Sequence, residues 1–148
     1  MAAGLALLAI LAGSLIPTQM AVNAQLARAI GGPVAATLVS FLAGTVALFG
    51  MNFLVFRQYP SWSDVTSTPV WLLVVGGVIG AAALSANVFL APRLGAAATL
   101  TFVIAGQLLA ALAIDRLGLF GFTQRDFSLG RVAGVLLVFV GAALVRLS

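Results

Sequence analysis

Five long apolar runs are the feature that most constrains what this chain can fold into. They cover residues 2–26, 33–56, 70–91, 95–114 and 130–147. A hydrocarbon core of about 30 Å takes about 20 helical residues to cross, so runs of this length suit membrane-spanning helices. In lipid the backbone must satisfy its own hydrogen bonds, which a helix does within one segment. The sequence therefore predicts an all-α, polytopic membrane protein with a single five-helix transmembrane domain over residues 1–148.

Composition agrees with this fold and excludes several kinds of function. Apolar residues make up 63% of the chain and charged residues 7%, with a mean hydropathy of +1.23, which is beyond the range of soluble domains. The seven arginines and three aspartates lie in predicted loops or at helix ends and form no basic run, so no nucleic-acid partner is expected. Cysteine, histidine, glutamate and lysine are missing. We therefore expect no metal, no cofactor and no enzymatic activity.

A proline and two amides interrupt the first apolar run. Pro17 has no backbone N–H and clashes with the carbonyl of Gly13, which predicts a helix kink and a freed backbone acceptor. Gln19 and Asn23 follow one turn apart on one face. Because transporters bind solutes at interrupted helices near the middle of the membrane, we expect both amides to line a polar pocket at the kink.

Other polar side chains are predicted to lie in the same half of the membrane. Asn87 lies late in the third run and Thr99 early in the fourth, while Gln107 lies near the middle of the fourth run and is expected to share a face with Thr99. The predicted substrate-binding residues are thus Gln19, Asn23, Asn87, Thr99 and Gln107. Amides and hydroxyls also form hydrogen bonds between helices, which stays an alternative for this set. It is the preferred interpretation of Asn52 and Ser85.

Two further patterns concern helix packing and charge. Gly134 and Gly141 lie seven residues apart on one face of the last run, and small residues at such spacing allow two helices to approach closely in lipid. They are the predicted dimer contact, although the same stripe could pack inside one subunit. Asp115 and Arg116 are interpreted as an ion pair at the end of a helix.

Two segments near the C-terminus, 94–118 and 130–145, carry a family pattern. Gly95-Ala96-Ala97, Thr99, Gln107-Leu108 and Asp115 follow in order, and Gln19 and Asn23 of the first run add to it. In these residues the chain resembles the half-length YdcZ-like proteins of the drug/metabolite transporter superfamily. The last run is also similar to the final helix of the small multidrug resistance exporters, in which a glycine stripe of this spacing packs the dimer.

This resemblance implies a helical, multi-pass transporter fold in the bacterial inner membrane, in which one chain is half a transporter. One departure matters. The small multidrug exporters couple to protons through a glutamate in the first helix, whereas this sequence has no glutamate and no aspartate in a predicted span. Proton coupling by that mechanism is therefore not expected, because a neutral amide does not titrate.

The predicted function is transport of a small polar or amphiphilic solute by alternating access as an antiparallel dimer. Five spans place four arginines on one side and three on the other, namely residues 57, 116, 125 and 131 against 28, 93 and 146. Since arginine asymmetry sets orientation, this near balance predicts insertion both ways, giving a homodimer, or a heterodimer with an oppositely oriented homologue. The alternative is a non-transporting subunit or scaffold for another membrane protein. The sequence leaves substrate and direction open.

Overall fold

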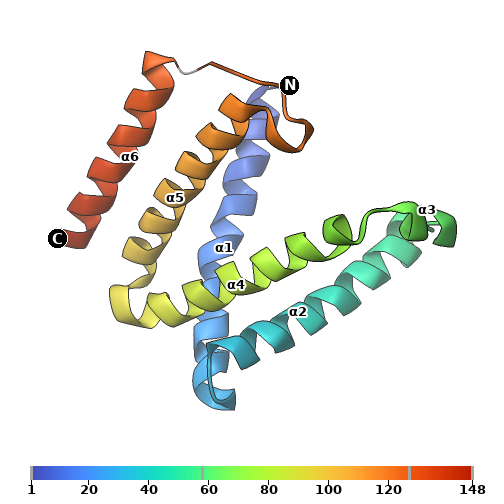
Figure 1. The fold of residues 1–148 in the computed structure, drawn as a ribbon. Coiled ribbons are helices and arrows are strands. Elements are labelled where there is room, and N and C mark those ends of the chain that lie inside the picture. Colours follow the sequence, from blue (N-terminus) through green and yellow to red (C-terminus); the bar gives the residue numbers. More distant parts are fainter. Residues whose placement is uncertain (1, 58, 127, 148) are drawn as a thin grey trace. The chain divides into compact units, whose positions relative to one another are not determined.

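The computed structural model describes residues 2–57, 59–126 and 128–147, and Figure 1 shows that these residues form helices joined by short connections. The elements are α1 (Ala2–Ile30), α2 (Pro33–Gly50), the π-helical turn η1 (Met51–Phe56), α3 (Trp62–Ser67), α4 (Val70–Leu94), α5 (Ala96–Leu117), the 3-10 turn η2 (Leu119–Gly121) and α6 (Leu129–Leu147). No strand occurs among the described residues. The all-α prediction is confirmed.

Among the described residues, four helical segments are long and apolar enough to cross a membrane: Gly4–Ile30, Pro33–Phe56, Val70–Leu94 and Ala96–Leu117. The fifth predicted span forms an apolar helix that is shorter, with its apolar part at Leu129–Val145. Helices α1 and α5 also end later than their apolar runs suggested, at Ile30 and Leu117. As a result, Asp115 lies inside the last turn of α5 rather than in a loop.

By its contacts the chain divides into two compact units, Met1–Phe89 and Leu90–Ser148, with the boundary inside α4. They are called unit 1 and unit 2 below, and each is described by itself. Unit 1 holds α1, α2, η1, α3 and most of α4, while unit 2 holds the end of α4 with α5, η2 and α6.

A two-glycine turn joins α1 to α2 in unit 1 (Figure 1). Gly31 and Gly32 have φ angles of 97° and 138°, which residues with a Cβ rarely adopt. The Gly32 N–H donates to the Ala27 carbonyl at 2.8 Å, so the turn closes directly on the last residues of α1. Pro33 then starts α2, where its missing N–H costs no helical bond. The turn makes α1 and α2 neighbours.

The core of unit 1 is built mainly from small side chains. Ala27, Ala36 and Val88 form a buried cluster, with Leu26 and Leu84 packed against it. Met20 of α1 is also buried, but many large apolar side chains on these helices are exposed, and Val46 and Val78 are more than half exposed. Small residues at helix contacts with bulky residues outside are typical of helices that pack in lipid.

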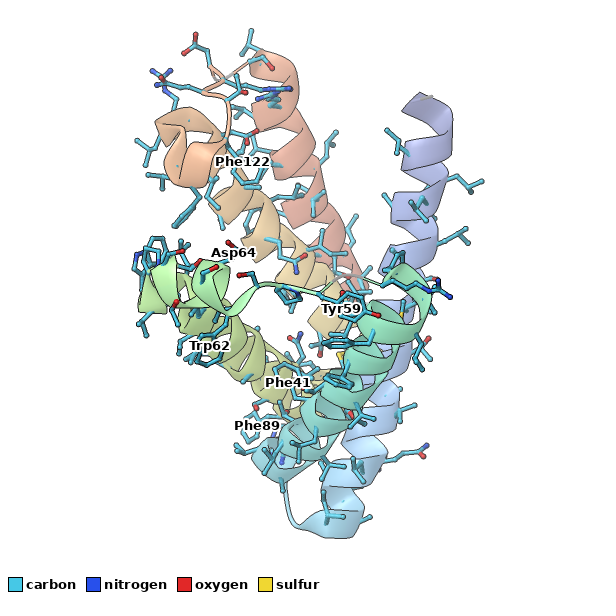
Figure 2. The ribbon with its side chains drawn as sticks, turned by 90° about the vertical axis from the view of Figure 1, so that its right-hand side faces the viewer. Phe41, Tyr59, Trp62, Asp64, Phe89 and Phe122 are labelled. Carbon is cyan, nitrogen blue, oxygen red and sulfur yellow. The ribbon has the colours of Figure 1, made fainter. Side chains whose placement is uncertain are left out.

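Aromatic residues lie close together at the end of η1 in unit 1. The Phe53 and Tyr59 rings lie 5.4 Å apart, and the Tyr59 hydroxyl donates to the Phe53 carbonyl at 3.4 Å. Figure 2 shows Tyr59 and Trp62 in the connection before α4, and both side chains are exposed. Exposed Tyr and Trp at a helix end suit the membrane–water interface.

In unit 2, helices α5 and α6 run side by side (Figure 1). Ala105, Val135 and Ala142 are buried there. The segment between the helices folds back on the end of α5: the Arg125 N–H donates to the Asp115 carbonyl at 2.9 Å, and the Gln124 side chain donates to the Arg116 carbonyl at 3.0 Å. These bonds satisfy backbone acceptors that a helix C-terminus leaves free.

Candidate functional site: a polar pocket between α1 and α2

A pocket of about 320 Å³ lies within unit 1, and it is lined by Gln19, Ser40, Phe41, Gly44, Thr45 and Leu48. Gln19 comes from α1 and the other five residues come from α2. Gln19 is close to the middle of the segment Gly4–Ile30, and Thr45 is close to the middle of Pro33–Phe56. The pocket therefore lies about halfway along both helices.

The pocket combines neutral hydrogen-bonding groups with an apolar wall. The Gln19 side chain is exposed and forms no hydrogen bond to any other residue that the structure describes, so its two N–H donors and its carbonyl oxygen stay available. The Thr45 hydroxyl donates to the Phe41 carbonyl at 2.8 Å, which leaves its oxygen free to accept. Phe41 and Leu48 line the same pocket, which therefore suits an uncharged polar or an amphiphilic molecule.

Asn23 has a different environment from Gln19, although the sequence grouped them. Asn23 is only 3% exposed, and its amide donates to the Ser40 hydroxyl of α2 at 3.2 Å. It does not line the pocket. The bond instead holds Ser40, which does, so Asn23 supports the pocket wall and ties α1 to α2.

A second polar contact joins α2 to α4. The Ser85 hydroxyl donates to Thr37 at 3.0 Å, and Thr37 is buried. The interpretation of Ser85 as a hydrogen bond between helices is confirmed. The α2 hydroxyls at Thr37, Ser40 and Thr45 were not among the predicted site residues, and their spacings of three and five residues do not keep to the three- and four-residue steps of one helix face.

Pro17 lies inside α1, which stays helical on both sides of it. Because proline has no N–H, the Gly13 carbonyl loses its usual helical donor one turn away. The predicted freed acceptor thus lies close in sequence to Gln19, and the size of any bend stays a prediction.

The other predicted binding residues are distributed over both units. Asn87 of α4 is half-buried in unit 1 and does not line the pocket. Thr99 of α5 is 1% exposed, and its hydroxyl donates to the Gly95 carbonyl at 2.8 Å, a bond within its own chain segment. Gln107 is exposed on α5. Eight residues turn a helix about 80° past two full turns, which explains why Thr99 and Gln107 differ in burial. Convergence of all five residues stays a prediction.

The α6 glycines lie in open space. Apart from the chain neighbours and nearby backbone of α6 itself, no heavy atom of the described residues would come within 4 Å of a Cβ added at Gly134 or Gly141. Neither glycine is therefore used for close packing inside the described chain. Their role as a dimer contact stays a prediction.

The charges at the end of α5 form two ion pairs that differ from the sequence interpretation. Asp115 pairs with Arg131 of α6 at 3.7 Å, and Arg116 pairs with Asp126 of the following segment. The expected pair between Asp115 and Arg116 is wrong, because successive residues of a helix do not face each other.

Comparison with known proteins gives one family. The family model described as "Putative inner membrane exporter, YdcZ" matches residues 4–144. No curated protein and no solved structure matches the chain. The matched range covers most of both units, including the pocket between α1 and α2, all of α5 and most of α6. Helices long and apolar enough to cross a membrane agree with the inner-membrane description. The chain belongs to the YdcZ family.

Proposed function

We propose that the protein moves a small polar or amphiphilic solute across the inner membrane, and that the pocket between α1 and α2 forms part of the binding site. The observation that carries this proposal is the Gln19 amide, which lines a pocket of about 320 Å³ halfway along a helix built to cross lipid. A polar group without a partner in an apolar environment costs free energy. A solute that pairs with the amide would offset this cost.

The proposed mechanism is alternating access by two oppositely oriented copies. In inverted-repeat transporters, two halves related by an axis in the membrane plane rock around a site near the midplane. The mid-helix depth of the Gln19 pocket supports this comparison. Opposed copies would present the same pocket to opposite faces, and a partner subunit of opposite orientation could take the second position.

Solute flux in liposomes tests the binding site. Purified protein is first screened with labelled neutral metabolites and amphiphilic amines to find a transported solute. Gln19→Leu should then lower the flux at least tenfold while the protein stays folded, because leucine fills a similar volume but forms no hydrogen bonds. The matched control is Gln25→Leu, an exposed amide of α1 that does not line the pocket, which should transport normally. Equal losses in both variants would contradict the pocket assignment.

Gln107 gives a second test of the same proposal. Gln107→Leu should abolish solute binding without changing the oligomeric state, if Gln107 also contacts the solute. Conversion of the variant to monomers or aggregates, with no selective loss of binding, would assign Gln107 to helix packing.

Orientation is tested with reporters fused to the C-terminus, one active only in the cytoplasm and the other only in the periplasm. Because the arginines divide four against three between the two predicted sides, both reporters should give signal when cells make this chain alone. Strong signal from a single reporter would rule out a homodimer of opposed copies and favour a partner of opposite orientation.

A second candidate function is a non-transporting membrane subunit that stabilises another membrane protein. The bonds from Asn23 to Ser40 and from Ser85 to Thr37 favour it, because they use polar side chains to join helices, and Asn23, Ser85 and Thr37 do not line the pocket. Flux by the purified chain alone would exclude this candidate. Flux that appears only with a second membrane protein would favour it.

A further inference from the structure

A second groove lies between α5 and α6 in unit 2, separate from the α1/α2 pocket. It has a volume of about 460 Å³ and is lined by Leu108, Ala111, Leu112, Asp115, Arg131, Gly134 and Val135. Five of these residues are apolar or glycine, and the two charged residues lie together at one end. From Leu108 to Asp115 the helix rises about 10 Å. The groove is thus apolar over about this length, with the two charged side chains at one end.

The two charged side chains at the end of the groove form an ion pair that is too long for a direct hydrogen bond. The Arg131 Nη1 and the Asp115 Oδ2 lie 3.7 Å apart, and the side chains are 35% and 37% exposed. A closed charge-assisted hydrogen bond would be about 2.7–2.9 Å long. A guanidinium has five N–H donors and a carboxylate has two acceptor oxygens. Each group therefore retains capacity for a charged ligand while it stays near the other.

The order of these groups along the helices matches that of a lipid in a membrane. Asp115 lies in the last turn of α5 and Arg131 near the start of α6, which places the charges at the helix ends where a membrane-spanning chain meets water. The apolar wall runs from there into the helical span. A headgroup at the charges and an acyl chain along the wall would have the same polarity order as the surrounding bilayer.

We propose that this groove binds a phospholipid whose headgroup carries a primary ammonium, as in phosphatidylethanolamine. The ammonium lies beside the Asp115 carboxylate and the phosphate beside the Arg131 guanidinium, while one acyl chain lies against Leu108, Ala111 and Leu112. A zwitterion satisfies both charges at once, whereas an anionic lipid without an ammonium leaves the carboxylate facing negative charge. The proposal does not depend on the α1/α2 pocket or on transport.

Lipid retention tests the proposal. The full chain is reconstituted in nanodiscs with equal amounts of phosphatidylethanolamine, phosphatidylcholine and phosphatidylglycerol, extracted in mild detergent, and analysed by native mass spectrometry. Phosphatidylethanolamine should be retained in preference to both others, because the choline ammonium has no N–H donors and the glycerol headgroup has no ammonium. Equal retention of the three lipids would overturn the proposal.

Variants that remove one charge test the ammonium contact and the phosphate contact of the headgroup separately. Asp115→Asn should remove the preference for phosphatidylethanolamine over phosphatidylglycerol. Arg131→Gln should lower retention of all three lipids about fivefold, the contribution of one basic side chain near a lipid surface. The matched control is Asp126→Asn, which removes the Arg116–Asp126 pair of the same segment but does not line the groove and should leave retention unchanged. Loss of retention in the control to the same extent would overturn the proposal.

Filling the groove distinguishes a lipid from a second copy of the chain as its occupant. Ala111→Phe adds a ring to the groove wall at an exposed position and should lower phosphatidylethanolamine retention with no change in oligomeric state. If this variant instead shifts the protein from dimer to monomer and leaves lipid retention unchanged, a second copy occupies the groove and the proposal is wrong.

Discussion

Removing the Asn23 amide should separate the free energy of one hydrogen bond between helices from that of filling buried space. Asn23 is 3% exposed and donates to Ser40 at 3.2 Å. The perturbation is a double-mutant cycle of Asn23→Ala and Ser40→Ala, because the coupling energy of the cycle cancels effects that each substitution has alone.

The expected coupling is small although the pair is largely buried. Hydrogen bonds between helices in membranes average about 0.6 kcal/mol and reach about 1.7 kcal/mol. We expect the lower value, because the Asn23 N–H donates to the Ser40 oxygen at 3.2 Å, which is at the long end of the range for such a bond. A coupling of about 0.6 kcal/mol changes the unfolding equilibrium about threefold. Asn23→Ala alone should cost more, about 1–3 kcal/mol, since it also leaves a cavity.

The assay is reversible unfolding in mixed micelles, followed by helix content for the four proteins of the cycle. A control cycle pairs Asn23→Ala with Thr66→Ala of α3, whose side chain is exposed, and should be additive within about 0.5 kcal/mol. A coupling above about 1.7 kcal/mol would show that Asn23 is a dominant structural residue. A coupling of zero would show that the bond from Asn23 to Ser40 does not stabilise the fold, and either result refutes the reasoning.

Two further outcomes are expected. Gly32→Ala should destabilise the protein by about 1–3 kcal/mol in the same unfolding assay, because the Gly32 φ of 138° lies in a region open essentially to glycine alone. The control Gly106→Ala, at a helical position with open space around it, should not destabilise the protein. Equal effects of the two substitutions would show that the backbone angle of Gly32 is not what requires glycine. Flux in liposomes should follow the solute gradient and not a proton gradient. The chain has no glutamate, lysine or histidine, and of its three aspartates Asp64 lies in α3, Asp126 lies between η2 and α6, and Asp115 lies at the end of α5. Stoichiometric proton movement would contradict this prediction and point to Asp115.

The helices could be predicted from the sequence better than their ends. Apolar runs of about 20 residues identify helices because lipid leaves the backbone few alternatives, and all five runs are helical. The ends depend on local turns: α1 continues to Ile30 because Gly31 and Gly32 are the first residues that leave the helix. Asp115 falls inside α5 for the same reason, since the helix ends at the left-handed Gly118.

The site was harder to predict, because a pocket residue and a packing residue have the same sequence pattern. Gln19 and Asn23 are both amides one turn apart on an apolar helix, yet Gln19 lines the pocket and Asn23 is buried against Ser40. The difference lies in what α2 presents at each level, a hydroxyl within reach of Asn23 and open space beside Gln19. Asp115 shows the same limit, because its partner Arg131 is sixteen residues away in sequence and only the hairpin of α5 and α6 brings them together.

The incomplete lining of the α1/α2 pocket gives the dimer proposal a physical reason. The pocket is lined from two helices, and its one amide is exposed. An amide that faces lipid costs free energy, whereas a second subunit or a bound solute that covers it lowers that cost. If the second subunit is an opposed copy, the axis in the membrane plane gives both membrane faces the same Gln19, Ser40 and Thr45 groups. The solute would then exchange one set of partners for an identical set as access alternates, so the two access states would differ little in binding free energy, as an exchange between states requires.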